Sequence, residues 1–410
     1  MSTNPPTLSR PSENIGLSVA LDGAGWHPAA WREPAARPAD LFSTAYWADL
    51  AAEAERGLLD FVTIEDSLGL QSDHFGGPPD SRTDQVRGRL DAALIAAALG
   101  PVTSSIGLVP TVTTTHTEPF HVSKSLATLD FVSHGRAGWR VQVSSKAHEA
   151  EHFGRRQIPA IGRNWESDDA SRRVVRELFD EAADVIEAVR RLWDSWEDDA
   201  EIRDIATGRF IDRGKLHYID FEGPAFSVKG PSITPRPPQG QPVVTALAHA
   251  QIPYELAARG ADLVFVTPQT VDEVPGIIEQ VRSAEASVAR TGTPLLINAD
   301  LLVVLDHTEQ AARDRRHRLD DLAGSALQSD AAIIATTPER LAGLLIEWAD
   351  AGLDGFRLRP AALPTDLVAI TRGVVPHLQR AGAFRSGYST TSLREHLGLP
   401  VAVNRYAAIA

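Results

Sequence analysis

Three residues in the first half of the chain have the spacing of a zinc site. His148, Glu149 and His152 form a His-Glu-x-x-His pattern, which binds zinc when a helix places both histidines on one face. The flanking residues do not favour such a helix, because Ser-Ser-Lys-Ala precedes the pattern and Phe-Gly-Arg-Arg follows it. Two interpretations remain open, a zinc hydrolase and a solvated loop with two histidines, and the sequence favours the loop.

Charged residues also stand at the ends of two β-type runs. Glu65 and Asp66 end one run, and Arg357 and Arg359 lie near the end of another. Carboxylates at the carboxyl end of a barrel strand indicate a functional site, although they also cap helices. Arginines two apart in a strand point the same way and can bind an anion together. Surface ion pairing is the alternative for both arginines.

The stretch VPTVTTTHTEPFH (109–121) combines hydroxyl and imidazole groups. Threonine hydroxyls such as that of Thr113 could hydrogen-bond a polar cofactor edge, and His116 and His121 could transfer protons. The alternative is a strand of β-branched residues followed by a helix that starts near Pro119.

The stretch DGAGWH (22–27) has two glycines after a strand but lacks the third glycine of a dinucleotide-binding fingerprint. The glycines favour a tight turn, either a plain one or one beside a ligand. In the second case Trp26, His27 and Trp31 could line the ligand site.

Eight short β-type runs must position these residues, and helical patterns separate them. Their mostly continuous apolar character is typical of strands buried on both faces, as in parallel sheets. The runs are 15–21, 60–66, 105–112, 137–143, 242–248, 262–267, 295–305 and 354–360.

Amphipathic helical patterns cover 43–57, 171–196 and 337–352. Eight alternations of strand and helix predict a (β/α)8 TIM barrel, with a doubly wound sheet as the alternative. Polar insertions at 144–170 and 197–241 are expected in the βα loops at the carboxyl-terminal face, where barrel active sites lie.

The chain divides into three predicted parts. Residues 1–14 form a disordered tail, 15–385 a single barrel domain, and 386–410 an extension that packs on the barrel or on a partner subunit.

Composition limits the function classes. The 410 residues include 40 Lys+Arg and 54 Asp+Glu, so the net charge of −14 argues against nucleic-acid or anionic-membrane binding. The absence of cysteine excludes disulfides and thiolate chemistry. No apolar run reaches the ~18 residues of a membrane span. A cytoplasmic protein is the simplest expectation.

Five longer segments carry a resemblance to a known family, at 23–34, 118–139, 192–200, 208–231 and 392–407. They resemble the bacterial luciferase-like, flavin-dependent monooxygenases, in the branch of the nitrilotriacetate, dibenzothiophene-sulfone and pristinamycin monooxygenases. The resemblance implies a (β/α)8 barrel that uses reduced FMN and O2, a separate flavin reductase, and a homodimer or homotetramer.

The resemblance also assigns flavin contacts. Asp66 and Thr113 match the family's residues after the second and third strands. The Gly-Arg-Ala-Gly-Trp stretch (135–139) is expected at the edge of the flavin pocket, where Trp139 fills space. Arg140 stands where the family has asparagine.

Three positions depart from the family at its phosphate contacts. Val175 and Phe179 replace a histidine and a tyrosine, and Ala250 replaces a serine, so none of these side chains can hydrogen-bond a phosphate. His249, Arg163 or Arg140 could compensate, or the chain binds a cofactor in another pose.

The leading hypothesis is therefore an FMNH2- and O2-dependent monooxygenase of a small organic substrate. His27 and His116 are the expected proton-transfer groups, and Arg357 is the expected partner of an anionic substrate group. The alternative from another class is a non-catalytic barrel, either a partner subunit or a ligand-binding homologue without the phosphate site.

Overall fold

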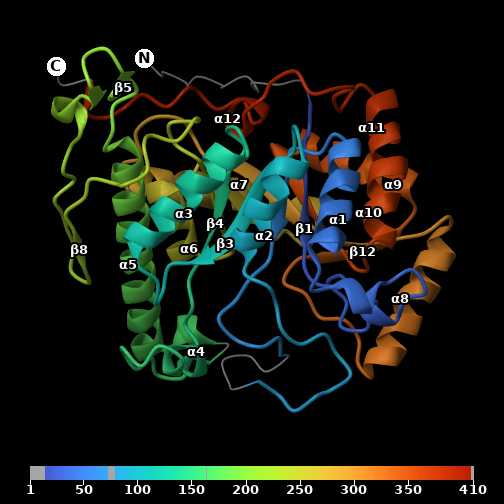
Figure 1. The fold of residues 1–410 in the computed structure, drawn as a ribbon. Coiled ribbons are helices and arrows are strands. Elements are labelled where there is room, and N and C mark those ends of the chain that lie inside the picture. The colour runs from blue at the N-terminus through green and yellow to red at the C-terminus, as the bar shows by residue number, and fades with distance from the viewer. Residues whose placement is uncertain (1–13, 73–78, 163, 408–410) are drawn as a thin grey trace, which may run out of the picture.

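The computed structural model describes residues 14–72, 79–162 and 164–407. Eight parallel strands pair in a closed ring, β1–β2–β3–β4–β9–β10–β11–β13 and back to β1, which confirms the predicted (β/α)8 barrel (Figure 1). Each strand falls on one of the eight predicted runs. The strands are β1 (Gly16–Leu21), β2 (Phe61–Ile64), β3 (Gly107–Thr113), β4 (Gly138–Gln142), β9 (Val243–Leu247), β10 (Leu263–Val266), β11 (Leu296–Leu305) and β13 (Gly355–Pro360).

A further parallel strand, β12 (Ala332–Thr336), was not predicted. Residues 301–303 of β11 pair with both β12 and β13, and residues 298–299 pair with both β10 and β13. Since a strand has two edges, β12 lies on the same edge of β11 as β10, farther along the strand. The ten-residue β11 is long enough to serve both neighbours.

Helices surround the strands, as Figure 1 shows, and bury apolar side chains against the outer face of the barrel. The predicted helices correspond to α1, α5 and α9, and the side chains of Ser43, Asp168 and Thr337 cap their first turns. The helices are α1 (Thr44–Arg56), α2 (Ala92–Leu99), α3 (Pro119–Val132), α4 (Ala147–Glu151), α5 (Asp169–Asp194), α6 (Gln251–Gly260), α7 (Val274–Ser287), α8 (Glu309–Ala323), α9 (Pro338–Asp350), α10 (Thr365–Ala369), α11 (Val375–Arg380) and α12 (Leu393–His396).

The interior of the barrel changes from apolar to polar along the strands. Near the amino-terminal ends, here called the barrel base, Phe61, Val109 and Val243 pack together with Leu393 of α12. Farther along the same strands, inward-facing residues are threonines and charged groups. Because successive strand residues face opposite sides, their neighbours pack outward against the helices.

Two long βα connections lie at the carboxyl-terminal ends of the strands, here called the barrel mouth. One runs from β2 to α2 over residues 65–91, and the other runs from β4 to α5 and contains α4. The sequence predicted only the second, within 144–170. In Figure 1 α4 lies at the lower end of the molecule and α12 at the upper end.

The insertion at 197–241 lies elsewhere than predicted. It follows helix α5 and precedes strand β9, so it is an αβ connection at the barrel base and not a βα loop at the mouth. It forms two small hairpins, β5 (Glu201–Asp204) with β6 (Arg209–Ile211) and β7 (Phe221–Glu222) with β8 (Ser227–Val228).

The Gly-Arg-Ala-Gly-Trp stretch also lies at the barrel base, which corrects the expectation that it borders the flavin pocket. A Cβ on Gly138 would lie 2.8 Å from Val109 Cγ2, so only glycine fits where β4 begins. Arg136 is 1 % exposed and hydrogen-bonds carbonyls of Gly100, Thr103 and Ile106. The motif therefore joins loops at the base.

The C-terminal extension is part of the described structure, whereas most of the N-terminal tail is not. The extension after residue 385 packs Leu393 into the base of its own barrel. The tail predicted to be disordered lies, apart from Asn14, outside the described residues. Among the residues that are described, no helix has the length and apolar character needed to cross a membrane.

Candidate functional site at the barrel mouth

A cavity of about 460 Å³ opens at the barrel mouth. This volume is within the range of pockets that bind small molecules and cofactors. Its walls come from the ends of β1, β2, β4 and β13 and from residues 65–72 and 85–89 of the connection between β2 and α2. The charged lining residues are Asp22, Glu65, Asp66, Arg89, Arg140, Lys146, Asp330 and Arg359.

An ion-paired network lies beneath the cavity. Asp300 of β11 accepts hydrogen bonds from Arg357, at 2.8 Å to Nε and 2.5 Å to Nη2, and from Arg359, at 2.9 Å to Nε. Glu65 lies 3.2 Å from Arg357 Nη1 and 3.2 Å from Arg140 Nη1. All five side chains are at most 9 % exposed.

The network reaches the cavity rim through Arg359. Its guanidinium binds both oxygens of Asp330, at 2.6 and 3.1 Å, and its Cζ lies 4.5 Å from the Trp26 ring centroid. Burial works to raise the pKa of Asp330, but Arg359 outweighs it and holds that pKa at about 2. Burial likewise opposes ionisation of Asp300, and the two arginines nevertheless hold its pKa below the usual range.

Two neighbouring inward residues of β4 leave hydrogen-bonding atoms unused. Arg140 donates from Nη1 to Thr111 Oγ1 at 3.1 Å, yet its buried Nε has no hydrogen-bond partner among the described residues. The buried Oε1 of Gln142 also lacks one. Both residues line the cavity, and burial lowers the pKa of Arg140. Buried unpaired polar atoms are rare and often indicate a ligand or water.

The opposite wall of the cavity is already hydrogen-bonded within the chain. Arg89 forms a two-point ion pair with Asp22, at 3.0 and 2.6 Å, and reaches Ser67 Oγ at 3.3 Å. Asp66 accepts the backbone N–H groups of Ser67 at 2.7 Å and Ala92 at 2.9 Å. Burial raises the pKa of Asp66. These contacts fix both ends of the 65–91 connection at the mouth.

His27 lines the cavity, but both of its ring nitrogens are engaged. Nδ1 accepts the backbone N–H of Ala29 at 3.1 Å, and Nε2 lies 3.1 Å from Asp320 Oδ1. Burial lowers the pKa of His27 and outweighs Asp320, which raises it. A neutral imidazole that donates to Asp320 fits this geometry, which holds the turn after β1.

His116 and Thr113 do not line the cavity. His116 has φ +70°, stacks on Phe153 with ring centroids 5.0 Å apart, and has a buried Nε2 without a hydrogen-bond partner among the described residues. Burial lowers its pKa. Thr113 is 5 % exposed at the end of β3. His121 lies exposed on α3, which does begin at Pro119.

Two other candidates are enclosed by the protein. Arg357 has no exposed side-chain surface, and its partners are Asp300, Glu65 and Thr63. The structure therefore places it below the cavity, where it cannot reach an anionic substrate group. Trp139 packs on the outer face of the barrel with its Nε1 donating to Val112 O at 3.0 Å, and so it does not border the mouth.

The positions that the resemblance assigns to the flavin phosphate are apolar. Val175 packs in a cluster with Ala150, Ile158, Ile161, Leu178 and Ile252, and Phe179 packs against the same cluster. Ala250 is the N-cap of α6 and provides no side-chain cap. His249 is exposed near Asp330, whose pKa its charge helps to lower. Arg163 lies outside the described residues.

The zinc-like pattern has a structural role. Glu149 is buried and accepts hydrogen bonds from Ser144 Oγ at 2.5 Å and Lys146 Nζ at 3.1 Å. A Cβ on Gly69 would lie 3.0 Å from both Glu149 Oε1 and His148 Nε2, so α4 packs closely on the 65–91 connection. Over the described part of the chain, no three His, Cys, Asp or Glu residues meet in a group that could hold a metal.

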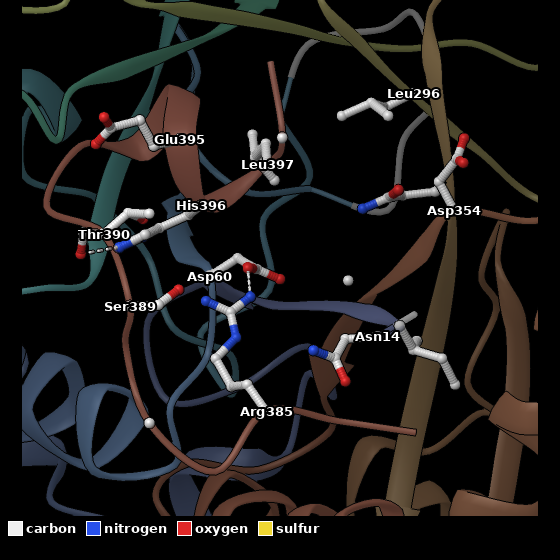
Figure 2. Close-up of a pocket in the computed structure, with 15 residues that line it drawn as sticks. Asn14, Asp60, Leu296, Asp354, Arg385, Ser389, Thr390, Glu395, His396 and Leu397 are labelled. Atoms are coloured by element: carbon white, nitrogen blue, oxygen red, sulfur yellow. Dashed lines mark hydrogen bonds and ion pairs between the residues drawn. The ribbon is translucent and has the colours of Figure 1, made fainter. Parts of the chain in front are cut away.

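A second cavity, of about 210 Å³, lies at the barrel base (Figure 2). Asp60 accepts the N–H of Leu17 at 2.6 Å and a hydrogen bond from Arg385, and His396 Nε2 lies 3.0 Å from Thr390 O. Figure 2 shows that the C-terminal extension contributes Ser389, Thr390, Glu395, His396 and Leu397 to the lining of this cavity. The strands present their amino-terminal ends here, the face that contributes to stability in barrels of this type.

Sequence patterns missed four residues that shape the mouth: Asp300, Asp330, Gln142 and Arg89. The sequence could have identified Asp300, because an aspartate inside an apolar strand must pair with a buried cation. Gln142 shares the inward face of β4 with Arg140, which strand periodicity also predicts. Asp330 and Arg89 lie in connections far from their partners, and no local pattern identifies them.

The mouth fits the ring of a flavin better than it fits the phosphate. The ring has N–H donors and carbonyl acceptors along one edge, and Arg140 Nε and Gln142 Oε1 offer an unused donor and acceptor. The Val175 cluster offers a phosphate no side-chain donor.

Comparisons with known proteins agree with this architecture. Residues 24–354 match the family described as luciferase-like monooxygenase. The chain is 31 % identical to the N-acetyl-S-(2-succino)cysteine monooxygenase of Bacillus subtilis, over 98 % of this chain and all of that protein. It is also 31 % identical to nitrilotriacetate monooxygenase component A of Aminobacter aminovorans, over 94 % and 96 % of the two chains.

Solved structures show the same fold. A long-chain alkane monooxygenase superposes with a TM-score of 0.82 at 23 % identity, over 94 % of this chain and 96 % of that one. An EDTA monooxygenase from Chelativorans sp. BNC1 gives a TM-score of 0.79 at 23 % identity, over 94 % and 98 % of the chains. On the family match and the full-length relatives, the chain belongs to the luciferase-like monooxygenase family.

Proposed function

We propose that this monooxygenase uses reduced flavin and O2 to oxidise a small organic molecule in the cavity at the barrel mouth. The observation that carries the proposal is the pair of unused, buried hydrogen-bonding atoms on Arg140 and Gln142, which line that cavity. Such atoms need a partner, and a flavin ring edge presents complementary groups.

Bound reduced flavin, FMN being the expected form, supplies the two electrons that let one oxygen atom enter the substrate while the other leaves as water. Arg140 and Gln142 would orient the ring edge. Trp26 and the described parts of the connection between β2 and α2, residues 65–72 and 79–91, would shield the cavity from bulk water. The ion pair between Arg89 and Asp22 holds this connection in place. We assign no proton transfer to His27, because both of its nitrogens are engaged.

Further parts of the proposal rest on the relatives. The Aminobacter aminovorans relative is named as one component of its monooxygenase, and a relative from Streptomyces pristinaespiralis is named as one of the subunits of pristinamycin IIA synthase. Both names support a separate partner. We propose that this partner is a flavin reductase, that the chain forms a homodimer or homotetramer, and that it acts in the cytoplasm.

A second candidate function is a non-catalytic barrel that has lost flavin. The apolar cluster around Val175 and Phe179 favours it, because these side chains leave a phosphate without donors. Affinity for FMN would then depend on the ring alone.

The test mixes anaerobically reduced FMN with an excess of the protein, and then adds isotopically labelled O2 with N-acetyl-S-(2-succino)cysteine, nitrilotriacetate and related molecules. The proposal expects one labelled oxygen atom in a product, only when reduced FMN is present. If the protein neither labels any compound nor changes the rate at which O2 oxidises reduced FMN, the non-catalytic alternative is supported.

A further inference from the structure

The C-terminal extension crosses the barrel base as an exposed, extended segment. Beyond α12, residues 399–404 run along the base without a bend or a turn. Val401 and Val403 lie at the surface, 83 % and 77 % exposed. In Figure 1 the chain continues from α12 along the upper end of the molecule, away from α4 and the mouth. Exposed valines two apart in an extended segment are typical of an edge strand.

Contacts with the rest of the chain hold this segment in place. Arg236 of the 197–241 insertion donates to Ala402 O at 2.9 Å. Next to it, the buried side-chain amide of Asn404 donates to Asp194 O at 2.9 Å and to Trp196 O at 2.8 Å. The backbone is thus ordered before any partner binds, which lowers the entropic cost of association.

The main chain of Val401 and Val403 makes no hydrogen bond within the described structure. This holds for the N–H and the C=O group of both residues. Successive residues of an extended chain direct these groups to opposite sides. Because Ala402 O is turned toward Arg236, the groups of Val401 and Val403 are turned away from their own barrel. They form the free edge of a short strand, and such an edge can pair with another chain.

This free edge is complementary to itself. When two copies pair antiparallel about a two-fold axis at Ala402, Val401 of one copy lies opposite Val403 of the other. The residues of each such pair exchange their N–H and C=O hydrogen bonds, so the free groups of both valines find partners. The valine side chains meet on one face of the ribbon as apolar cross-strand pairs.

Charge also favours a second copy at this place. The chain carries a net charge of −14, so two copies repel each other on average. Residues 397–404 include no charged side chain. The charged groups that flank the segment are paired within the chain, Arg236 with Asp198 and Arg405 with Glu187. Two copies can therefore meet here without bringing unpaired like charges together.

The insertion adds apolar surface beside the segment. A ribbon of this length is too small alone, because stable interfaces bury more than about 1,000 Å². Ile233, 67 % exposed, lies on the same loop as Arg236. Tyr406 stacks on His217 of the insertion with ring centroids 4.6 Å apart. The insertion and the extension therefore form one surface at the barrel base.

We propose that two copies of this chain associate base to base, with residues 400–404 of each copy paired antiparallel about a two-fold axis. The inference rests on the proposed function only for the expectation of a homo-oligomer, and it depends neither on flavin nor on turnover. Both mouths face away from the interface in this assembly, so they stay open to a substrate and to a reductase.

Sedimentation velocity of the purified protein without added flavin, over a range of concentrations, measures the mass and the dissociation constant of the assembly. In the proposed register V401K/V403K places lysine opposite lysine, whereas V401K/V403E places lysine opposite glutamate. Both variants change mostly exposed side chains, so the barrel should fold normally. The control is F42K, because Phe42 is 58 % exposed in the β1–α1 connection at the mouth.

We expect the wild type and F42K to form the same assembly. V401K/V403K should raise the dissociation constant by about tenfold or more and release a species of half the mass, because like charges directly opposite each other destabilise a strand pair. V401K/V403E should retain the assembly, because the two-fold axis brings unlike charges together.

The inference is overturned if the wild type is a monomer or if V401K/V403K keeps the wild-type dissociation constant. It is also overturned if V401K/V403E dissociates as readily as V401K/V403K, because the antiparallel register would then be wrong. Failure of the proposed function gives a different pattern. In that case no product is labelled and no reduced flavin binds, while the assembly still forms and still depends on Val401 and Val403.

Discussion

Replacing Asp300 with asparagine tests the buried network most severely. Asp300 has no exposed side-chain surface and accepts hydrogen bonds from both Arg357 and Arg359. Asparagine offers one acceptor in place of two and turns an amide N–H₂ toward a guanidinium. The network would then hold three buried cations and a single buried carboxylate. Removing one partner of a buried ion pair costs about 3–5 kcal/mol, and we expect D300N to lose that much free energy of unfolding.

Equilibrium unfolding in urea, followed by circular dichroism and tryptophan fluorescence, measures this loss. The matched control is D199N, because Asp199 pairs with Lys215 at a position that is 72 % exposed, and we expect no measurable change there. A second variant, D300N/R357M, removes one of the stranded cations and should recover part of the lost stability. If D300N unfolds at the same urea concentration as D199N, the network does not depend on Asp300 and the reasoning is refuted.

Three further predictions concern the rim, the base and the cofactor. The pKa of Asp330 is about 2 in the folded protein and about 3.9 in the unfolded chain, so the ionised carboxylate stabilises the fold above about pH 4. The difference in free energy of unfolding between wild type and D330N should therefore disappear as the pH falls from about 4 toward 2. A difference in unfolding midpoint that does not change with pH would contradict this. L393A should lose about 2–5 kcal/mol of free energy of unfolding, because it leaves a cavity at the barrel base, while the affinity of the mouth for reduced FMN stays unchanged. A parallel loss of both would show that base and mouth are coupled. FMN and riboflavin should bind within about tenfold of each other by fluorescence titration, because Val175 and Phe179 give the phosphate no donor; a far larger FMN preference would locate the phosphate on other groups.

Periodicity and composition were sufficient to predict the barrel. Continuous apolar runs separated by helical patterns identified all eight barrel strands, since buried parallel strands have few sequence alternatives. They missed β12, whose run AIIAT is short and only partly buried. They also misplaced 197–241, because a polar insertion carries no mark of which barrel face it belongs to.

The site was less predictable because its groups meet only after folding. Arg357 and Arg359 were predicted to point the same way, either toward an anion or toward surface ion pairs. Their partner Asp300 comes from the neighbouring strand β11, and it changes what Arg357 can do. The family resemblance suggested Arg140 as a departure from asparagine. The structure adds that its Nε is buried and has no partner among the described residues, a fact that no single-sequence pattern contains.

The central claim, that the barrel mouth binds reduced flavin for reaction with O2, is tested most directly by an anaerobic titration of the protein with reduced FMN, followed by calorimetry. The account predicts saturable binding with a dissociation constant in the micromolar range or tighter. R140Q should weaken this binding, and R203Q, which replaces an arginine of the β5–β6 hairpin whose side chain is 63 % exposed, should leave it unchanged. An absence of binding up to millimolar reduced FMN would contradict it and would support the non-catalytic barrel.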